Sequence, residues 1–161
     1  MERVPVLKIG DMLLVSIQID MEDQVALQLQ EDLADRIVTT GCHGVIIDIS
    51  TLDSARAQVV MERLLQTLVD TGSPYAIIDI TGVPAVDTQV AQHILKTVVA
   101  ARLMGADCII SGIRPQIAQT IVALGIEFGD IATKASLADA LRHVLRLTGV
   151  QSGRRSAHRE G

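Results

Sequence analysis

The chain has 161 residues, which is the size of one domain, and 48% of them are hydrophobic. Tyr75 and Phe128 are its only aromatic residues, and the formal net charge is −5. Because stacking platforms and an excess of positive charge are both missing, we expect no nucleic-acid partner.

The sequence favours a cytoplasmic protein with reduced thiols. No apolar stretch approaches the roughly 18 residues of a membrane span, and no secretory leader is recognisable, so no membrane partner is expected. Cys42 and Cys108 lie far apart, and the adjacent Cys42 and His43 have poor spacing for ligands of one metal ion. We therefore expect no metal and no cofactor.

The N-terminal part is predicted to form a hairpin, a helix and a strand. Strands are expected at Val6–Ile9 and Leu13–Ile19, joined by a Gly-Asp turn. A helix is predicted from Asp23 to Thr40, because apolar residues recur every four positions along it. Gly41 suits the end of this helix, and the apolar segment Val45–Ile49 indicates a strand buried on both faces.

A helix-turn-strand unit then occurs a second time. Shifting the chain by 31 residues aligns Ala26–Ile49 with Ala57–Ile80 and gives ten identities. The match ends in the same four residues, since Ile46-Ile47-Asp48-Ile49 aligns with Ile77-Ile78-Asp79-Ile80. This match indicates a duplicated helix-turn-strand unit, longer than chance would give but too short for a repeat array.

The remaining elements continue the alternation of helices and strands, which predicts an α/β fold with a mixed, mostly parallel sheet and flanking helices. From Gln151 onward no apolar pattern remains, and we expect a disordered tail. In chain order we predict a helix at Thr88–Met104, a strand at Cys108–Ile110, a helix opening at Pro115, an edge segment at Ile126–Ile131 and a helix at Leu137–Leu147.

The segment from Asp79 to Thr88 is the first candidate site. A strand ends at Asp79, Gly82 and Pro84 turn the chain, and Asp87 and Thr88 stand where the next helix begins. A helix cap is one interpretation and contributes about 1 kcal/mol. Phosphorylation of Thr88 is the other, because a phosphate would meet free backbone N–H groups and the positive end of the helix dipole. It would add negative charge to a surface expected to carry Asp79 and Asp87.

Two further places allow a similar interpretation. Ser54 opens the helix that follows Val45–Ile49, and it is either a cap or a second phosphoacceptor. Asp48 and Asp79 near strand ends, with Lys134 beyond a later strand, suggest a phosphoaspartate receiver. That arrangement needs an acidic pair after the first strand to hold Mg²⁺, and the sequence does not supply one there.

No enzymatic motif is found. The common dinucleotide, phosphate-loop, nucleophile-elbow and zinc signatures are missing, and the four histidines are scattered. The turn Ser111–Pro115 joins a strand to a helix and allows a small-ligand or nucleotide site, although a plain turn is the simpler interpretation. We therefore expect a protein that is not an enzyme.

Several motifs resemble one known family. The segments Ile78–Thr88, Ala101–Ala106 and Gly112–Thr120 are similar to the STAS domains of bacterial stressosome proteins, relatives of the anti-sigma-factor antagonists. The similarity of Leu52–Gly149 is to the C-terminal half of RsbR-type proteins. Residues Val4–Asp53 resemble the RsbS-type partner instead.

The resemblance implies a function in stress signalling. Family members co-assemble into large cytoplasmic complexes with other RsbR-type and RsbS-type proteins, and they hold an RsbT-type serine/threonine switch kinase. The kinase phosphorylates the STAS domains and leaves, and a phosphatase resets the system. By motif, the acceptors would be Thr88 and Ser54, with Asp79, Gly82, Pro84 and Asp87 around the first. The resemblance thus implies a homo- or hetero-oligomeric scaffold.

The chain also departs from the family pattern. After Ile47–Ser50 an RsbS-type chain would continue to its own Asp-Ser acceptor, but here the sequence passes directly into the RsbR-like segment. We therefore expect a fusion of two homologous units near residues 48–53. Its predicted parts are an RsbS-like segment at 1–50, an RsbR-like STAS unit at 51–149 and a tail at 150–161.

Overall fold

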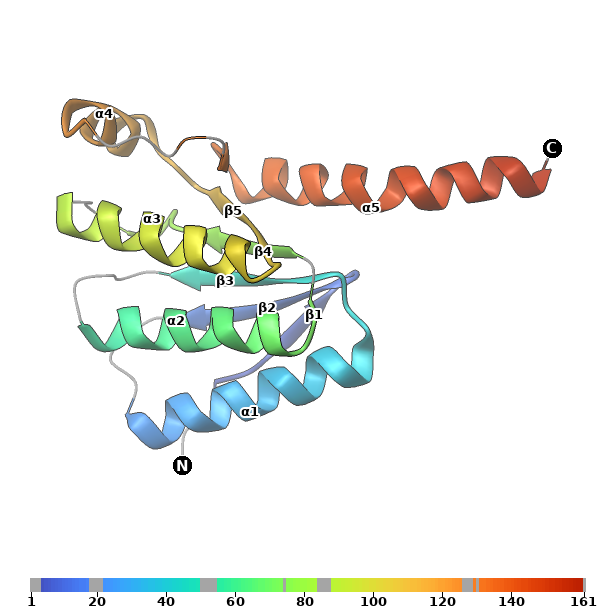
Figure 1. The fold of residues 1–161 in the computed structure, drawn as a ribbon, viewed down its shortest axis with the longest axis horizontal. Coiled ribbons are helices and arrows are strands. Elements are labelled where there is room, and N and C mark those ends of the chain that lie inside the picture. The colour runs from blue at the N-terminus through green and yellow to red at the C-terminus, as the bar shows by residue number, and fades with distance from the viewer. Residues whose placement is uncertain are drawn as a thin grey trace.

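A six-stranded sheet organises the molecule, and its strands follow one another in chain order (Figure 1). The computed structural model describes residues 4–17, 22–49, 55–73, 75–83, 88–125, 129 and 131–160, without the side chains of 55–58 and 149–160. The strands are β1 Leu7–Ile9, β2 Met12–Ile17, β3 Gly44–Ile49, β4 Tyr75–Asp79, β5 Asp107–Ser111 and β6 Ala132–Lys134. β1 and β2 are antiparallel, and every later pair is parallel, so the predicted mixed, mostly parallel sheet is confirmed.

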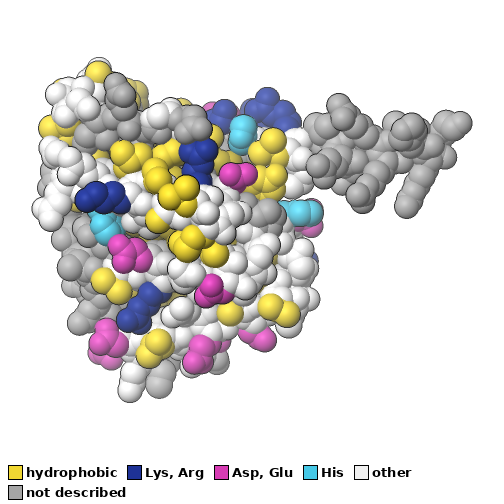
Figure 2. Space-filling model, viewed as in Figure 1, with side chains coloured by type: hydrophobic (Ala, Val, Ile, Leu, Met, Phe, Trp, Pro, Cys, Tyr) yellow, Lys and Arg dark blue, Asp and Glu magenta, His cyan; other side chains and the backbone are white. Residues whose placement is uncertain are grey.

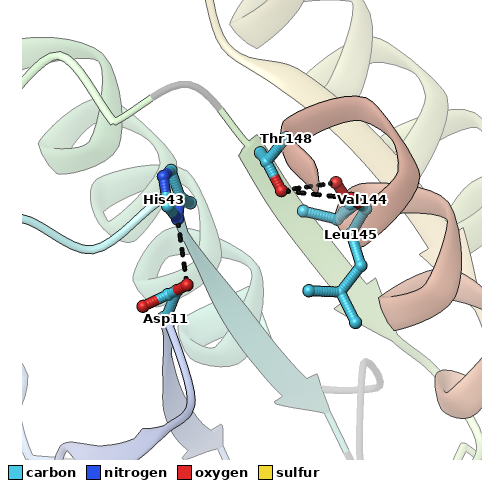
Figure 3. Close-up of polar contacts among 5 residues, drawn as sticks. All are labelled: Asp11, His43, Val144, Leu145 and Thr148. Atoms are coloured by element: carbon cyan, nitrogen blue, oxygen red, sulfur yellow. Dashed lines mark hydrogen bonds and ion pairs between the residues drawn. The ribbon is translucent and has the colours of Figure 1, made fainter. Parts of the chain in front are cut away.

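The N-terminal hairpin forms as predicted. Gly10 takes a φ of 58° in the turn, a conformation that glycine adopts without steric cost. The next connection is tied to this turn, because the backbone N–H of His43 donates to the Asp11 carbonyl at 2.8 Å. The His43 side chain also points toward Asp11, with Nδ1 3.6 Å from Oδ2 (Figure 3). The turn and the α1–β3 junction are thus joined side by side.

The helices lie on the two faces of the sheet in unequal number. Four pack their apolar sides on one face, where α1, α2 and α3 lie side by side (Figure 1). The last helix, α5, covers the other face against β4, β5 and β6. The bounds are α1 Asp23–Thr40, α2 Ala55–Asp70, α3 Thr88–Leu103, α4 Pro115–Ala123 and α5 Leu137–Glu160.

The two copies of the repeat are neighbours in space. Helix α1 with β3 forms the first copy, and α2 with β4 forms the second. β3 and β4 pair in parallel, with Ile46 opposite Ile77 and Asp48 opposite Asp79. Both copies contribute buried residues to the same core, among them Leu33 of α1 and Leu64 of α2. The N-terminal segment is therefore part of the same packed unit as the rest of the described chain.

The last strand and the last helix differ most from their predicted bounds. The structure has an edge strand at Ala132–Lys134, where pairing with β5 sets its position; most of the predicted segment Ile126–Ile131 lies outside the described residues. Helix α5 continues to Glu160, past Leu147, so the tail expected to be disordered is helical and extends away from the sheet (Figure 1). Once a helix exists, adding residues to its end needs no new nucleus.

Candidate functional site

The candidate site lies at the carboxyl ends of the parallel strands, where ligands and partners of open α/β sheets most often bind. β4 ends at Asp79, and the connection from β4 to α3 starts there. β5 ends at Ser111, and its connection leads to α4. The site therefore consists of two neighbouring loops and the helix starts that follow them.

Thr88 is the first residue of α3 and is exposed. The first turn of a helix has backbone N–H groups without helical partners, and it carries the positive end of the dipole. The structure thus places the hydroxyl where an added negative charge would be tolerated electrostatically. Ser54, Pro84 and Asp87, which the sequence also singled out, lie outside the described residues.

Asp79 is not on the surface as the sequence analysis expected; its side chain is only 6% exposed. One carboxylate oxygen, Oδ1, accepts two hydrogen bonds, from Ser111 Oγ at 2.8 Å and from Thr81 Oγ1 at 2.9 Å. The carboxylate therefore joins the end of its own strand to the end of β5. This burial was missed because Ser111 lies 32 residues further along the chain.

A row of polar side chains crosses the sheet at this level. Parallel pairing places Ser16, Asp48, Asp79, Ser111 and Lys134 opposite one another on five successive strands. The row shares the face of the sheet that α5 covers. The sequence shows that Ser16, Asp48, Asp79 and Ser111 lie at or near the carboxyl ends of apolar strands. It does not show the strand register that places them opposite one another.

Asp48 is the residue of this row whose ionisation its surroundings alter. Burial raises the pKa of the Asp48 carboxyl above 3.8, and the neighbouring charge of Asp79 raises it further. The hydrogen bond from Ser16 Oγ to Asp48 Oδ2, at 3.3 Å, lowers the same pKa and opposes both effects. Its burial and the negative charge of Asp79 thus disfavour the ionised form of Asp48.

The β5–α4 connection holds the β4–α3 connection by further contacts. The Ile80 N–H donates to the Ser111 carbonyl at 2.9 Å, and Arg114 Nη2 donates to the Val83 carbonyl at 2.6 Å. Gly112 has a φ of 78°, and a Cβ there would overlap Thr81 Oγ1. The two loops are therefore in contact over most of the described part of the first.

One structural feature supports the phosphoaspartate receiver interpretation, and another argues against it. Lys134 does lie in the same row as Asp48 and Asp79. However, Asp79 is buried and engaged by two hydroxyl groups, and no group of three or more possible ligands for a metal ion occurs among the described residues. At the Gly112 turn, which the sequence offered as a small-ligand site, Thr81 and the Asp79 carboxylate occupy the space beside the glycine.

The remaining candidate side chains are distributed over the structure. Cys42 and Cys108 are buried free thiols. His93 on α3 faces Glu62 on α2, with Nε2 3.4 Å from Oε1, so it bridges two helices. On the face shown in Figure 2, charges of both signs are interspersed with exposed hydrophobic side chains. None of the helices in the described part of the chain is both long enough and apolar enough to span a membrane.

Comparison with known proteins places this geometry in a family. The STAS domain family matches residues 49–140, which include Asp79, Thr88 and the Ser111–Arg114 segment. The chain is 44% identical over 133 residues to RsbT co-antagonist protein RsbRA of Bacillus subtilis (strain 168), covering 81% of this chain and 48% of that protein. It is 40% identical over 98 residues to RsbRD of the same organism, covering 61% of this chain and 35% of that protein.

These relatives are longer than the chain, which spans about half or less of their length. The aligned length with RsbRA is large enough to include part of the segment before residue 52. The predicted junction between an RsbS-like and an RsbR-like part lies at residues that the structure does not fully describe, and it stays a prediction.

One solved structure, a variant of RsbS from Moorella thermoacetica, is 23% identical with a TM-score of 0.48, covering 90% of this chain and 97% of that one. The family match extends over more than half of the chain and agrees with the six-stranded sheet and flanking helices described above. The chain belongs to the STAS domain family.

Proposed function

We propose that this chain is a non-enzymatic, cytoplasmic scaffold of the stressosome, phosphorylated on its STAS domain by a serine/threonine switch kinase. Thr88 is the main acceptor and Ser54 the second. The observation that carries the proposal is an exposed Thr88 hydroxyl at the first residue of α3, inside the region that matches the family. The names of the relatives, RsbT co-antagonist proteins, support an RsbT-type kinase as the enzyme.

The consequence of phosphorylation follows from charge. A phosphate adds about −1.5 to −2 charge at neutral pH, next to the start of a helix whose dipole favours it. The fold therefore tolerates the modification, while a partner docked on this edge of the sheet meets a new charge. In this proposal the kinase leaves the assembly in response, and a phosphatase restores the initial state. The chain acts together with other RsbR-type and RsbS-type STAS proteins.

The test is phosphorylation by a purified RsbT-type kinase with Mg²⁺-ATP, mapped by mass spectrometry. Phosphate is expected on Thr88 and is expected to disappear from that site in Thr88→Ala. Thr120→Ala is the matched control, because Thr120 is also an exposed helical threonine. Absence of phosphate from Thr88 in a folded parent protein would contradict the proposal.

The same experiment distinguishes the scaffold from a phosphoaspartate receiver. The receiver is the alternative that the position of Lys134 in one row with Asp48 and Asp79 supports. An acyl phosphate on aspartate is cleaved by hydroxylamine, whereas phosphothreonine and phosphoserine are stable to it. Label removed by hydroxylamine from Asp48 or Asp79 would favour the receiver function. Stable label on Thr88 favours the scaffold.

A further inference from the structure

We propose that Asp79 and Arg114 are positioning residues for the Thr88 acceptor, acting through the loop that precedes it. Together with Ser111 and Gly112 they hold the described part of the β4–α3 connection, residues 80–83, against the β5–α4 connection. We call this set of four residues the loop clamp. The inference rests on the proposed function, because it concerns how Thr88 is presented to a kinase.

The inner part of the loop clamp is polar and buried. Asp79 accepts hydrogen bonds from Thr81 Oγ1 on its own loop and from Ser111 Oγ on the neighbouring strand. Ser111 is fully buried, and its carbonyl also accepts from the Ile80 N–H at 2.9 Å. Because Asp79 and Ser111 have little access to water, losing one of them leaves the other with an unsatisfied polar group. The start of the loop is thereby fixed to β5.

The close approach of the two loops requires a residue without a side chain. A Cβ on Gly112 would lie 2.6 Å from Thr81 N and 2.7 Å from Asp79 Oδ1. Its φ of 78° also falls in a region that other residues rarely adopt. Two independent constraints thus select glycine at the point where the β5–α4 turn contacts Asp79 and Thr81.

The outer part is the Arg114 side chain. Arg114 precedes Pro115 at the start of α4, and its Nη2 reaches the Val83 carbonyl at 2.6 Å. The Val83 side chain is buried in the main core, and its N–H donates to the Ile80 carbonyl at 3.0 Å. A charged donor on a loop carbonyl makes a stronger hydrogen bond than a neutral one. Arg114 therefore fixes the end of the described loop from outside while the Val83 side chain anchors it from within.

An acceptor hydroxyl reacts only in the orientation that the kinase requires. Prior ordering of residues 80–83 removes entropy that binding would otherwise have to remove. The loop clamp therefore affects phosphoryl transfer more than it affects docking of the kinase, which contacts a wider surface. The expected signature is a fall in kcat with a small change in KM.

Arg114→Gln is the main test variant, since it removes the charge from an exposed side chain. Phosphorylation of Thr88 is expected to slow roughly tenfold, mainly in kcat, and Arg114→Lys is expected to recover part of the rate. Arg142→Gln is the matched control, because Arg142 is an exposed arginine on α5 that pairs with Asp139. Asp79→Ala is expected to slow the reaction as well, with partial recovery in Asp79→Asn, whose amide oxygen still accepts the two hydroxyl groups.

Hydrogen exchange tests the loop clamp without any kinase. Amide exchange of Ile80 and Val83 is expected to accelerate in Arg114→Gln while α1 and α5 are unchanged. Unaltered exchange would overturn the inference. If the parent protein is not phosphorylated on Thr88, the proposed function is contradicted. Hydrogen exchange still decides whether Arg114 holds the loop. Equal rates of Thr88 phosphorylation in the parent and in Arg114→Gln would contradict the positioning role and leave the proposed function intact.

Discussion

Asp48 and Asp79 lie directly opposite each other on the parallel strands β3 and β4, and they are also equivalent positions in the two copies of the 31-residue repeat. Duplication of one helix-strand unit therefore placed two copies of one carboxylate side by side. The duplicated sequence carries a cost that a single copy would not have, because like charges on adjacent strands repel. Ser16 and Ser111 flank the pair: Ser16 donates a hydrogen bond to Asp48, and Ser111 donates one to Asp79.

Replacing Asp48 with asparagine is expected to stabilise the protein at neutral pH. The pKa of Asp48 is raised in the folded state, so the folded protein holds more protons than the unfolded one between pH 3.8 and the raised pKa. Stability contributed by this group is therefore lost as the pH rises through that window. Asp48→Asn removes this loss, and we expect a gain of roughly 0.2–1 kcal/mol at pH 7 that shrinks toward pH 3. Urea unfolding at several pH values measures it.

Asp35→Asn serves as the control, because Asp35 is an exposed aspartate of α1. It should change the free energy of unfolding at pH 7 by less than about 0.5 kcal/mol. A loss of stability in Asp48→Asn at pH 7 would contradict repulsion within the pair.

Truncation of Leu33 tests whether the N-terminal segment shares one core with the rest. Leu33 on α1 is fully buried in the cluster that also contains residues of α2 and α3. Leu33→Ala is expected to lower the free energy of unfolding by about 2–5 kcal/mol while the transition stays single. Val38→Ala on the same helix, where the side chain is 73% exposed, should change it by less than about 0.5 kcal/mol. Two separate transitions in the parent would show independent units.

Cys108 is expected to resist alkylation in the folded protein. Burial, assisted by the charge of Asp107 and opposed by Arg102, raises the pKa of its thiol from 9.0 to about 12. The reactive thiolate is then roughly a thousandfold rarer at pH 8. Iodoacetamide should label Cys108 in urea but not in buffer, as read by mass spectrometry. Rapid labelling of the native protein would mean that β5 opens on the timescale of the reaction.

A glutamate in place of Thr88 tests the electrostatics of the helix start. Thr88→Glu is expected to be neutral or to stabilise by about 0.3–1 kcal/mol at low salt, because an acidic residue suits the first turn of a helix. High salt should reduce the effect. Thr97→Glu in the same helix is the contrasting variant, since Thr97 is buried and donates to the His93 carbonyl at 2.8 Å. It should destabilise strongly, by more than about 2 kcal/mol.

Local patterns predicted most of the elements, and non-local contacts account for what they missed. The four-residue spacing in α1 and the glycine that ends it gave that helix its observed bounds. The position of β6 depended on pairing with β5, which a three-residue strand does not encode. The burial of Asp79 and the contact of Arg114 with Val83 each join residues about 30 positions apart. The helix start at Thr88 was predicted correctly because helix starts have a local signature, whereas the loop clamp has none.

The agreement of strand order with chain order has a consequence for synthesis on the ribosome. Whenever a strand of this sheet emerges, the neighbour with which it pairs has already been made, and no strand waits for a later one to be inserted between them. The sheet can grow in one direction, one helix-strand unit at a time. A unit duplicated in tandem extends such a sheet without changing the order of the strands before or after it.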